Sequence, residues 1–124
     1  MARAKVQMGE LEAAVMGVLW ELGGWCTPGE VHDVLAAERP LAYTTVMTIL
    51  VRLWKKGRVR RQRDGRAFAY RPVFSREEEV AARMNEVLAK AGDRPQALSF
   101  FLESLAPHDR AQLRRMLKDQ GSRG

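Results

Sequence analysis

The sequence has few of the residues that cross-link small proteins or bind metals in them. It contains one cysteine and two histidines in 124 residues. Cys26 therefore cannot form a disulfide within the chain, and His32 and His108 lack the spacing of metal ligands. No apolar run approaches the roughly 20 residues that span a bilayer, and residues 1–5 do not begin a signal peptide. We expect a cytoplasmic protein with no metal, no cofactor and no membrane insertion.

Catalytic motifs are also missing. The sequence has no phosphate-binding loop, no nucleophile elbow and no pair of catalytic carboxylates. A chain of 124 residues is too short for a large two-domain enzyme with a cofactor cleft. The acidic run at residues 77–79 is explained by its place at a helix N-terminus, where the helix dipole favours negative charge. We expect no enzymatic activity and no catalytic residues.

What the sequence does have is a local excess of positive charge. The whole chain carries a net charge of +6. Residues 1–74 have a net charge of +5 and residues 75–124 of +1. Residues 52–71 alone hold nine basic side chains and one acid, a net charge of +8. This concentration favours an anionic partner, because a charge that is merely solvated would be spread more evenly.

Three helices are predicted before residue 57. Apolar residues recur every three or four positions in segments 10–22, 28–39 and 43–56. Thr27 and Glu30 form a capping box around Pro28 at the start of the second segment. Glycines 23, 24 and 57 and Pro40 mark the helix ends. The predicted core stripe of the third helix consists of Val46, Ile49, Leu50, Leu53 and Trp54.

A β-hairpin is predicted next. Segments 59–63 and 66–71 read as strands around Asp64-Gly65, a strong hairpin signal. Phe68 and Tyr70 lie two residues apart and share one face of the second strand. Three helices followed by a basic hairpin predict a winged helix-turn-helix. The fold class is therefore mainly α with a small β-hairpin wing, and residues 1–74 form the winged-helix domain.

Residues 75–124 are predicted to form a second, helical domain. Ser75 and Glu78 form another capping box, and this helix is expected to end at Gly92. Further helices begin at Asp93-Pro95 and at Pro107, and the tail from residue 120 is expected to fray. Three short amphipathic helices cannot easily bury their apolar faces alone, so we expect either a homodimer or packing against the first domain. The candidate dimerisation residues are Val80, Met84, Val87, Leu88, Leu98, Phe101, Leu102 and Leu105.

The third helix and the wing supply the candidate DNA-binding residues. Thr44, Thr45 and Thr48 are short enough for the helix to enter a major groove, where their hydroxyls and methyls can reach bases or phosphates. Tyr43 could reach a phosphate or belong to the core. The cations expected to bind the DNA backbone or a narrow minor groove are Arg52, Lys55, Lys56, Arg61, Arg63 and Arg66. For an isolated helix, a solvated polar face is the competing interpretation.

Two parts of this pattern resemble the penicillinase repressor family (BlaI/MecI type). The first is Gly9-Glu10-Leu11-Glu12, with Val15-Met16, Leu19-Trp20 and Glu30-Val31-His32. The second is the run from Ala42 to Thr48, with Leu53, Lys56-Gly57, Asp64-Gly65-Arg66 and Tyr70. The resemblance covers about residues 8–118. It implies a cytoplasmic homodimeric transcriptional repressor with an N-terminal winged helix and a C-terminal dimerisation domain.

The resemblance also implies a regulatory pathway. Family members bind dyad-symmetric operators upstream of β-lactam-resistance and related genes, and a membrane sensor metalloprotease cuts the repressor within its dimerisation domain. The family's Asn-Phe cleavage point corresponds here to Ser99-Phe100. Phe100 is retained and the Asn is replaced, so Ser99-Phe100 is a candidate cleavage site only. Related copper-responsive repressors have a cysteine-rich C-terminus, which is absent from this sequence.

A winged-helix module that binds an acidic protein partner is the alternative function. A protein-docking helix more often exposes an apolar face, whereas this helix presents threonines beside a cationic hairpin. The sequence therefore favours DNA as the partner.

Overall fold

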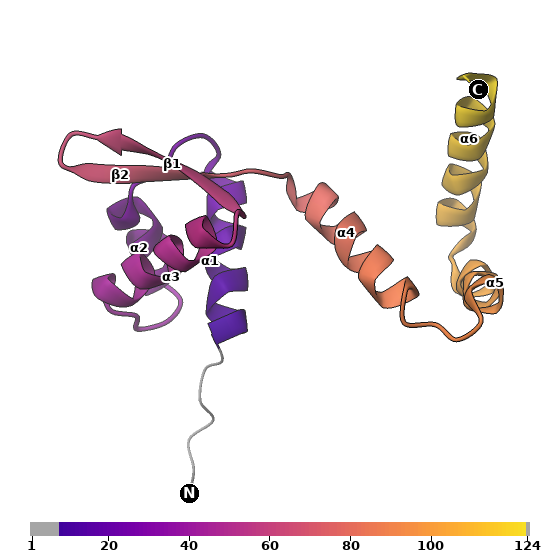
Figure 1. Ribbon diagram of the computed structural model, residues 1–124, viewed down its shortest axis with the longest axis horizontal. Coiled ribbons are helices and arrows are strands. Elements are labelled where there is room, and N and C mark those ends of the chain that lie inside the picture. Colours follow the sequence, from indigo (N-terminus) through magenta and orange to yellow (C-terminus); the bar gives the residue numbers. More distant parts are fainter. Residues whose placement is uncertain (1–7, 124) are drawn as a thin grey trace, which may run out of the picture. The chain divides into compact units, whose positions relative to one another are not determined.

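The computed structural model describes residues 8–123, and of residues 122 and 123 only the backbone. Within this range, six helices and one antiparallel hairpin confirm the fold class expected from the sequence (Figure 1). In chain order the elements are α1 (Met8–Leu22), α2 (Pro28–Ala36), α3 (Tyr43–Lys55), β1 (Val59–Asp64), β2 (Ala67–Pro72), α4 (Arg76–Leu88), α5 (Arg94–Ser104) and α6 (Pro107–Arg123).

The capping box expected before α2 is present. The backbone N–H of Glu30 donates to Thr27 Oγ1 at 3.2 Å, and the backbone N–H of Thr27 donates to Glu30 Oε1 at 2.8 Å. These bonds satisfy two donors that the first helical turn would otherwise leave without partners. They also lower the pKa of the Glu30 carboxyl, chiefly through the backbone N–H of Thr27 and then through its hydroxyl.

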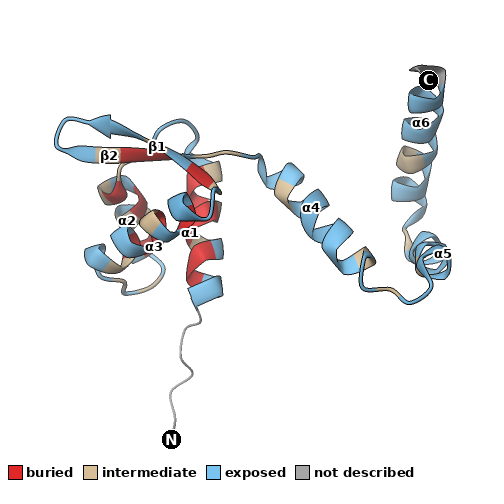
Figure 2. Ribbon diagram, in the orientation of Figure 1, coloured by how far each residue is buried: buried red, intermediate tan, exposed pale blue. Residues whose placement is uncertain are grey.

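The core of the first unit lies between α1, α2, α3 and the base of the hairpin, where Figure 2 shows the buried segments. Each helix contributes one apolar stripe at the three- and four-residue spacing of the sequence. The buried cluster consists of Leu11, Val15, Met16, Val18, Leu19, Cys26, Val31, Leu35, Val46, Ile49, Leu50, Leu53, Val59 and Tyr70. Trp54 was expected in this core, and that expectation is wrong: it is 38% exposed.

The hairpin turn lies one residue later than the sequence pattern suggests. Asp64 is paired with Ala67 at the end of the ladder, so the loop residues are Gly65 and Arg66. Gly65 has φ +67°, and Arg66 does not have positive φ. A positive φ at the first loop position alone is the pattern of a type II′ turn, which favours Gly there. Asp64 therefore extends β1.

The hairpin is fastened to the helices by a short backbone bridge. The N–H of Cys26 donates to Tyr70 O, and the N–H of Tyr70 donates to Cys26 O, both at 2.8 Å. The segment between α1 and α2 thus pairs with β2 as a one-residue third strand. Tyr70 and Cys26 are each 2% exposed. This pairing fixes the base of the wing on the core.

The helices after the hairpin start where the sequence indicates and differ at their ends. The Ser75–Glu78 capping box forms, and the side chain of Asp93 accepts from the N–H of Gln96 at 3.0 Å. The first of these helices, α4, ends at Leu88, four residues before the expected stop at Gly92. The last helix, α6, continues to Arg123, into the tail that is expected to fray, and residue 124 of that tail lies outside the described residues.

The chain divides into two compact units between Val80 and Ala81, inside α4. The sequence-based boundary at residues 74 and 75, immediately before α4, stays a prediction. Within the second unit none of the residues from 81 to 121 is buried (Figure 2). A hydrogen bond joins two of its helices: the Arg110 guanidinium on α6 donates to Leu102 O of α5 at 2.8 Å. A core of the kind found in the first unit is not formed by residues 81–121 of one chain.

Candidate nucleic-acid interface

One face of α3 carries hydroxyls at its front and cations at its back. Thr44, Thr48, Arg52 and Lys55 follow each other at spacings of four, four and three residues, so they lie in one row along the helix. All four are exposed, while the opposite face of α3 is buried in the core. Thr45 beside them is half-buried. The helix therefore presents a continuous polar row, with short side chains at its N-terminal end and long side chains at its C-terminal end.

The hydroxyl of Thr48 is already engaged. It donates to Thr44 O at 2.9 Å, one helical turn earlier. Its hydrogen is therefore directed to the helix backbone, and the side chain offers a methyl group and an oxygen lone pair to a neighbour. Such a side chain can contact a thymine methyl or accept from a base amino group.

The N-terminus of α3 is open to an anion. Ala42 occupies the N-cap position, and among residues 8–123 no side chain caps this helix end. Uncapped helix N-termini attract phosphate groups through their N–H groups and the helix dipole. Tyr43, the next residue, is 43% exposed, and its ring meets the His32 ring edge-on at 5.9 Å between centroids. Of the two places that the sequence allows for Tyr43, the structure has the surface one.

Two of the candidate DNA-binding cations face a buried acid. Lys56 Nζ lies 2.8 Å and 2.9 Å from the two carboxylate oxygens of Glu12, and Arg52 Nε lies 3.8 Å from Glu12 Oε2. The Glu12 side chain is only 7% exposed. Both cations remain about half exposed, at 51% and 49%. Sequence reasoning missed Glu12, although its place in the apolar stripe of α1, next to Leu11, is a signal that it is buried.

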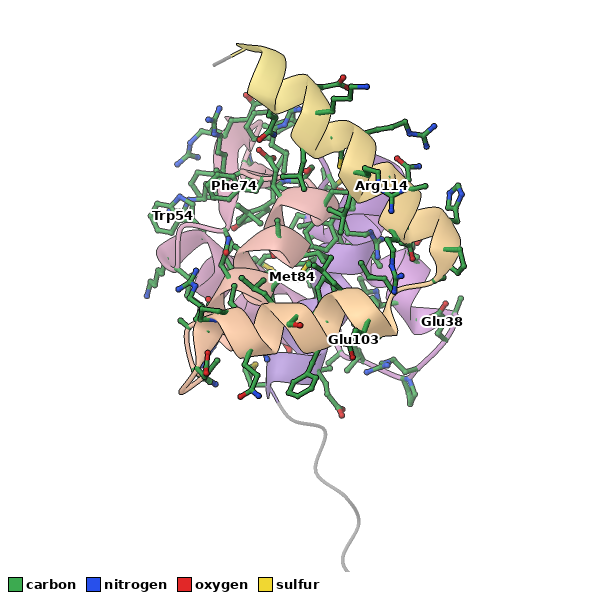
Figure 3. The ribbon with its side chains drawn as sticks, turned by 90° about the vertical axis from the view of Figure 1, so that its right-hand side faces the viewer. Glu38, Trp54, Phe74, Met84, Glu103 and Arg114 are labelled. Carbon is green, nitrogen blue, oxygen red and sulfur yellow. The ribbon has the colours of Figure 1, made fainter. Side chains whose placement is uncertain are left out.

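The wing is attached to the end of α3 by stacked side chains. The Arg61 guanidinium lies 3.5 Å from the centroid of the Trp54 ring and 4.1 Å from that of Phe68. Arg63 also lies over Phe68, at 5.2 Å. Trp54 is labelled at the surface in Figure 3. Arg61 and Arg63 thus lie over aromatic rings, and Arg61, which is half-buried, is less free than Arg63 to reach a ligand.

The remaining candidate cation of the wing is at its tip. Arg66 occupies the turn after Gly65 and is exposed. In the described part of the chain, the side chains of Arg66 and Lys55 take part in no ion pair and no hydrogen bond. These two residues therefore carry the least encumbered positive charges of the interface, one on α3 and one on the wing.

The candidate dimerisation residues lie on α4 and α5, except Leu105, which directly follows α5. Most of them are exposed, and Leu88 and Leu105 are half-buried. Met84, labelled in Figure 3, is 53% exposed, and Val87 is 60% exposed. Ser99 and Phe100 lie inside α5, and Phe100 is 61% exposed. Exposed apolar surface of this extent is unusual on monomeric proteins.

The described residues contain neither a membrane-spanning helix nor a metal-binding cluster. No helix among residues 8–123 has the length and apolar character to cross a membrane. No group of three or more His, Cys, Asp or Glu side chains in that same range is placed to hold a metal ion.

Helices α2 and α3, the polar row on α3 and the hairpin that follows α3 define a winged helix-turn-helix protein. A sequence profile described as penicillinase repressor matches residues 8–119, and the chain belongs to this family. The transcriptional regulator BlaI of Mycobacterium tuberculosis is 46% identical over 116 residues, which cover 91% of this chain and 84% of the relative. A solved structure titled the DNA binding domain of the repressor BlaI is 28% identical and has a TM-score of 0.50. The match covers 63% of this chain and 93% of that domain.

Proposed function

We propose that this protein is a sequence-specific DNA-binding transcriptional repressor that acts as a homodimer on a dyad-symmetric operator. The observation that carries the proposal is the exposed row of Thr44, Thr48, Arg52 and Lys55 on α3, flanked by the basic wing. Short hydroxyl side chains at the front of the row read base edges, and the cations behind them bind phosphates. Membership of the penicillinase repressor family supports the same function.

The division of roles within the interface follows from the contacts of each residue. Thr44, Thr45 and Thr48 are assigned to the major groove, and Tyr43 and the helix N-terminus to a flanking phosphate. Lys55 and Arg66 make direct phosphate contacts. Arg61 orders the wing by stacking, which leaves Arg63 and Arg66 to reach the DNA.

The homodimer is supported by the apolar surface of the second unit. Val80, Met84, Val87, Leu98, Phe101 and Leu102 are all between 43% and 60% exposed. Burying apolar surface stabilises an interface by roughly 25 cal/mol per Å² before the entropic cost of association. A second copy of the same helices offers a matching apolar surface, as expected for a two-fold interface. Sedimentation equilibrium of the full chain tests this: a monomer at micromolar concentration contradicts it.

Relief of repression by proteolysis is proposed for α5. What supports it is the resemblance to the penicillinase repressor family, which implies β-lactam-resistance or related genes as targets and a membrane sensor metalloprotease as the activating partner. Ser99 and Phe100 lie within the helical span Arg94–Ser104, whereas proteases bind extended substrates. Cleavage therefore requires α5 to unwind locally. Mass spectrometry of the repressor after antibiotic challenge tests the site: a fragment ending at Ser99 supports it, and an intact chain under derepression contradicts it.

Binding of an acidic protein is the alternative that the exposed wing arginines leave open. A gel shift with genomic fragments, in the presence and absence of competitor DNA, separates the two functions. The repressor retains particular fragments when excess unrelated DNA is added, because base contacts discriminate among sequences. A module for an acidic partner loses all fragments equally.

A further inference from the structure

Three contacts hold the first turn of α4 and the preceding residue Phe74 to the rest of the winged-helix unit. Arg58 at the start of the wing forms a bidentate ion pair with Glu79, through Nη2 to Oε1 and through Nε to Oε2. The indole N–H of Trp20 on α1 donates to Phe74 O at 3.0 Å, immediately before α4. The Arg76 guanidinium lies over the Trp20 ring at 5.1 Å. Contacts of α1 and of Arg58, the residue before β1, thus converge on one helix start.

Arg58 is itself held in place from several sides. Its N–H donates to Leu53 O at 2.9 Å, and its carbonyl accepts from the N–H of Val73 at 3.0 Å. Its Nη1 lies 3.8 Å from Glu12 Oε1. Glu12 in turn accepts two hydrogen bonds from Lys56, at the end of α3. A chain of charges therefore runs from α3 through Glu12 and Arg58 to Glu79 on α4.

This chain of charges is better protected from solvent than an ordinary surface salt bridge. The side chains of Glu12 and Glu79 are 7% and 18% exposed, and that of Arg58 is 32% exposed. Bidentate arginine–carboxylate pairs also fix geometry, because two parallel bonds define an orientation as well as a distance. The network is therefore suited to holding a helix start in one orientation.

Helix α4 connects the two units without a break. It is one helix from Arg76 to Leu88, and the division between the units falls within it, after Val80. Its first turn, which carries Glu79, belongs to the winged-helix unit. The same helix continues from this turn to Met84, Val87 and Leu88, which are candidate dimerisation residues.

We propose that the Arg58–Glu79 pair, supported by Glu12, positions α4 and thereby sets the half-site spacing that the dimer selects. This inference rests on the proposed function of a homodimer on a two-half-site operator. One additional base pair shifts a half-site by about 3.4 Å and rotates it by roughly a tenth of a turn. If the start of α4 is held in one orientation, the reading helix cannot follow both the shift and the rotation of its half-site. Glu79 is thus a positioning residue for spacing and contributes no base contact.

The test compares the full-length variants Glu79→Gln and Glu77→Gln. Both remove one negative charge from the first turn of α4, and among residues 8–123 the side chain of Glu77 forms no ion pair and no hydrogen bond, whereas that of Glu79 pairs with Arg58. The probes are duplexes that the wild-type chain selects from a random library, remade with the spacer shortened or lengthened by one and two base pairs. A probe with a single half-site is included.

We expect the wild-type chain and Glu77→Gln to bind altered spacers at least about tenfold more weakly than the selected spacer, the loss typical of one misplaced contact region. Glu79→Gln should bind the same altered spacers with roughly threefold loss or less. Binding to the single half-site should be the same for all three proteins. A folding defect would weaken half-site binding as well, so it is distinguished from loss of positioning.

A second measurement needs no DNA. Hydrogen exchange of the backbone amides in the first two turns of α4 should be faster in Glu79→Gln than in Glu77→Gln. Trp20→Phe, which removes the donor to Phe74 O and keeps an aromatic ring under Arg76, should act in the same direction. Equal spacer preference in Glu79→Gln and Glu77→Gln overturns the positioning role alone. A wild-type chain that selects no two-half-site DNA overturns the dimeric function on which it rests.

Discussion

The guanidinium of Arg61 lies between two aromatic rings, 3.5 Å from the centroid of Trp54 and 4.1 Å from that of Phe68. Trp54 is in the last turn of α3 and Phe68 is on β2. The contact therefore joins the end of the proposed reading helix to the wing. It explains why a tryptophan in the helical periodicity of α3 remains at the surface: its ring is covered on one face by a cation that belongs to the hairpin.

Replacing Trp54 with alanine should loosen the wing. A cation–π contact contributes about 0.5–2 kcal/mol, depending on its exposure. Because Trp54 is 38% exposed, we expect a loss of unfolding free energy near 1 kcal/mol in urea titrations, and faster hydrogen exchange along β1 and β2. Trp54→Phe, which retains a ring for Arg61, should lose less. Equal losses in the two variants would mean that the stack with Arg61 does not matter.

Thr48 should discriminate bases through its methyl group. Its hydroxyl donates to Thr44 O, so it offers DNA only an acceptor. Thr48→Val keeps a methyl and loses that acceptor together with the bond to Thr44 O, whereas Thr48→Ser keeps the hydroxyl and loses the methyl. We expect Thr48→Ser to reduce the preference for selected over scrambled DNA more than Thr48→Val does. Replacing thymine with uracil in the probe should weaken binding of the wild type and leave Thr48→Ser unaffected. The opposite order of the two variants would assign the readout to the hydroxyl.

Affinity for DNA should fall steeply with salt. If a dimer makes 6–10 phosphate contacts, its binding constant should drop by roughly 10³–10⁵ between 50 and 200 mM salt. Arg66→Gln at the wing tip should reduce the slope of log K against log salt by about 0.9 for each protomer that loses a contact. Arg83→Gln on α4 serves as the control, because it removes the same charge at a position outside both α3 and the wing. A nearly flat salt dependence of the wild type would contradict phosphate binding.

The capping box of α2 should contribute stability that depends on pH. The folded protein lowers the pKa of Glu30 through the N–H and then the hydroxyl of Thr27. This contribution is complete above the carboxyl's ordinary pKa and is lost as pH falls through the lowered value. Thr27→Ala should cost about 1 kcal/mol at neutral pH. The difference between wild type and Thr27→Ala should shrink in acid; a difference that grows would contradict the direction of the shift.

The sequence predicts the elements of the fold well because their signals are local. The capping pairs Thr27–Glu30 and Ser75–Glu78 act over three residues, and both form as expected. The hairpin is also specified locally, and the error of one residue at its turn arises because Gly65 can take the first loop position as well as the second. Helix ends without a strong local signal are placed less accurately, as at Leu88.

Contacts between distant residues could not be predicted in this way. Glu12 and Lys56 are 44 residues apart, and Cys26 pairs with Tyr70 across the core. The prediction that Lys56 and Arg52 bind DNA was based on local charge alone and did not include their contact with the buried carboxylate of Glu12. The roles of the DNA-binding and dimerisation residues, and of Ser99-Phe100, stay predictions, because each depends on a partner rather than on the fold of one chain.

Cys26 gives the winged-helix unit a built-in chemical reporter. It is the one thiol of the sequence, it is 2% exposed, and burial, followed by the charge of Glu30, raises its pKa. An alkylating reagent can reach its Sγ only when the bridge to Tyr70 opens. The rate of labelling therefore measures how often this unit opens, and the helices from Ala81 onward, which contain no thiol, contribute no signal. Bound DNA should slow the alkylation of Cys26 in proportion to the fraction of protein that is bound. The wild-type chain can therefore report DNA binding without an added label.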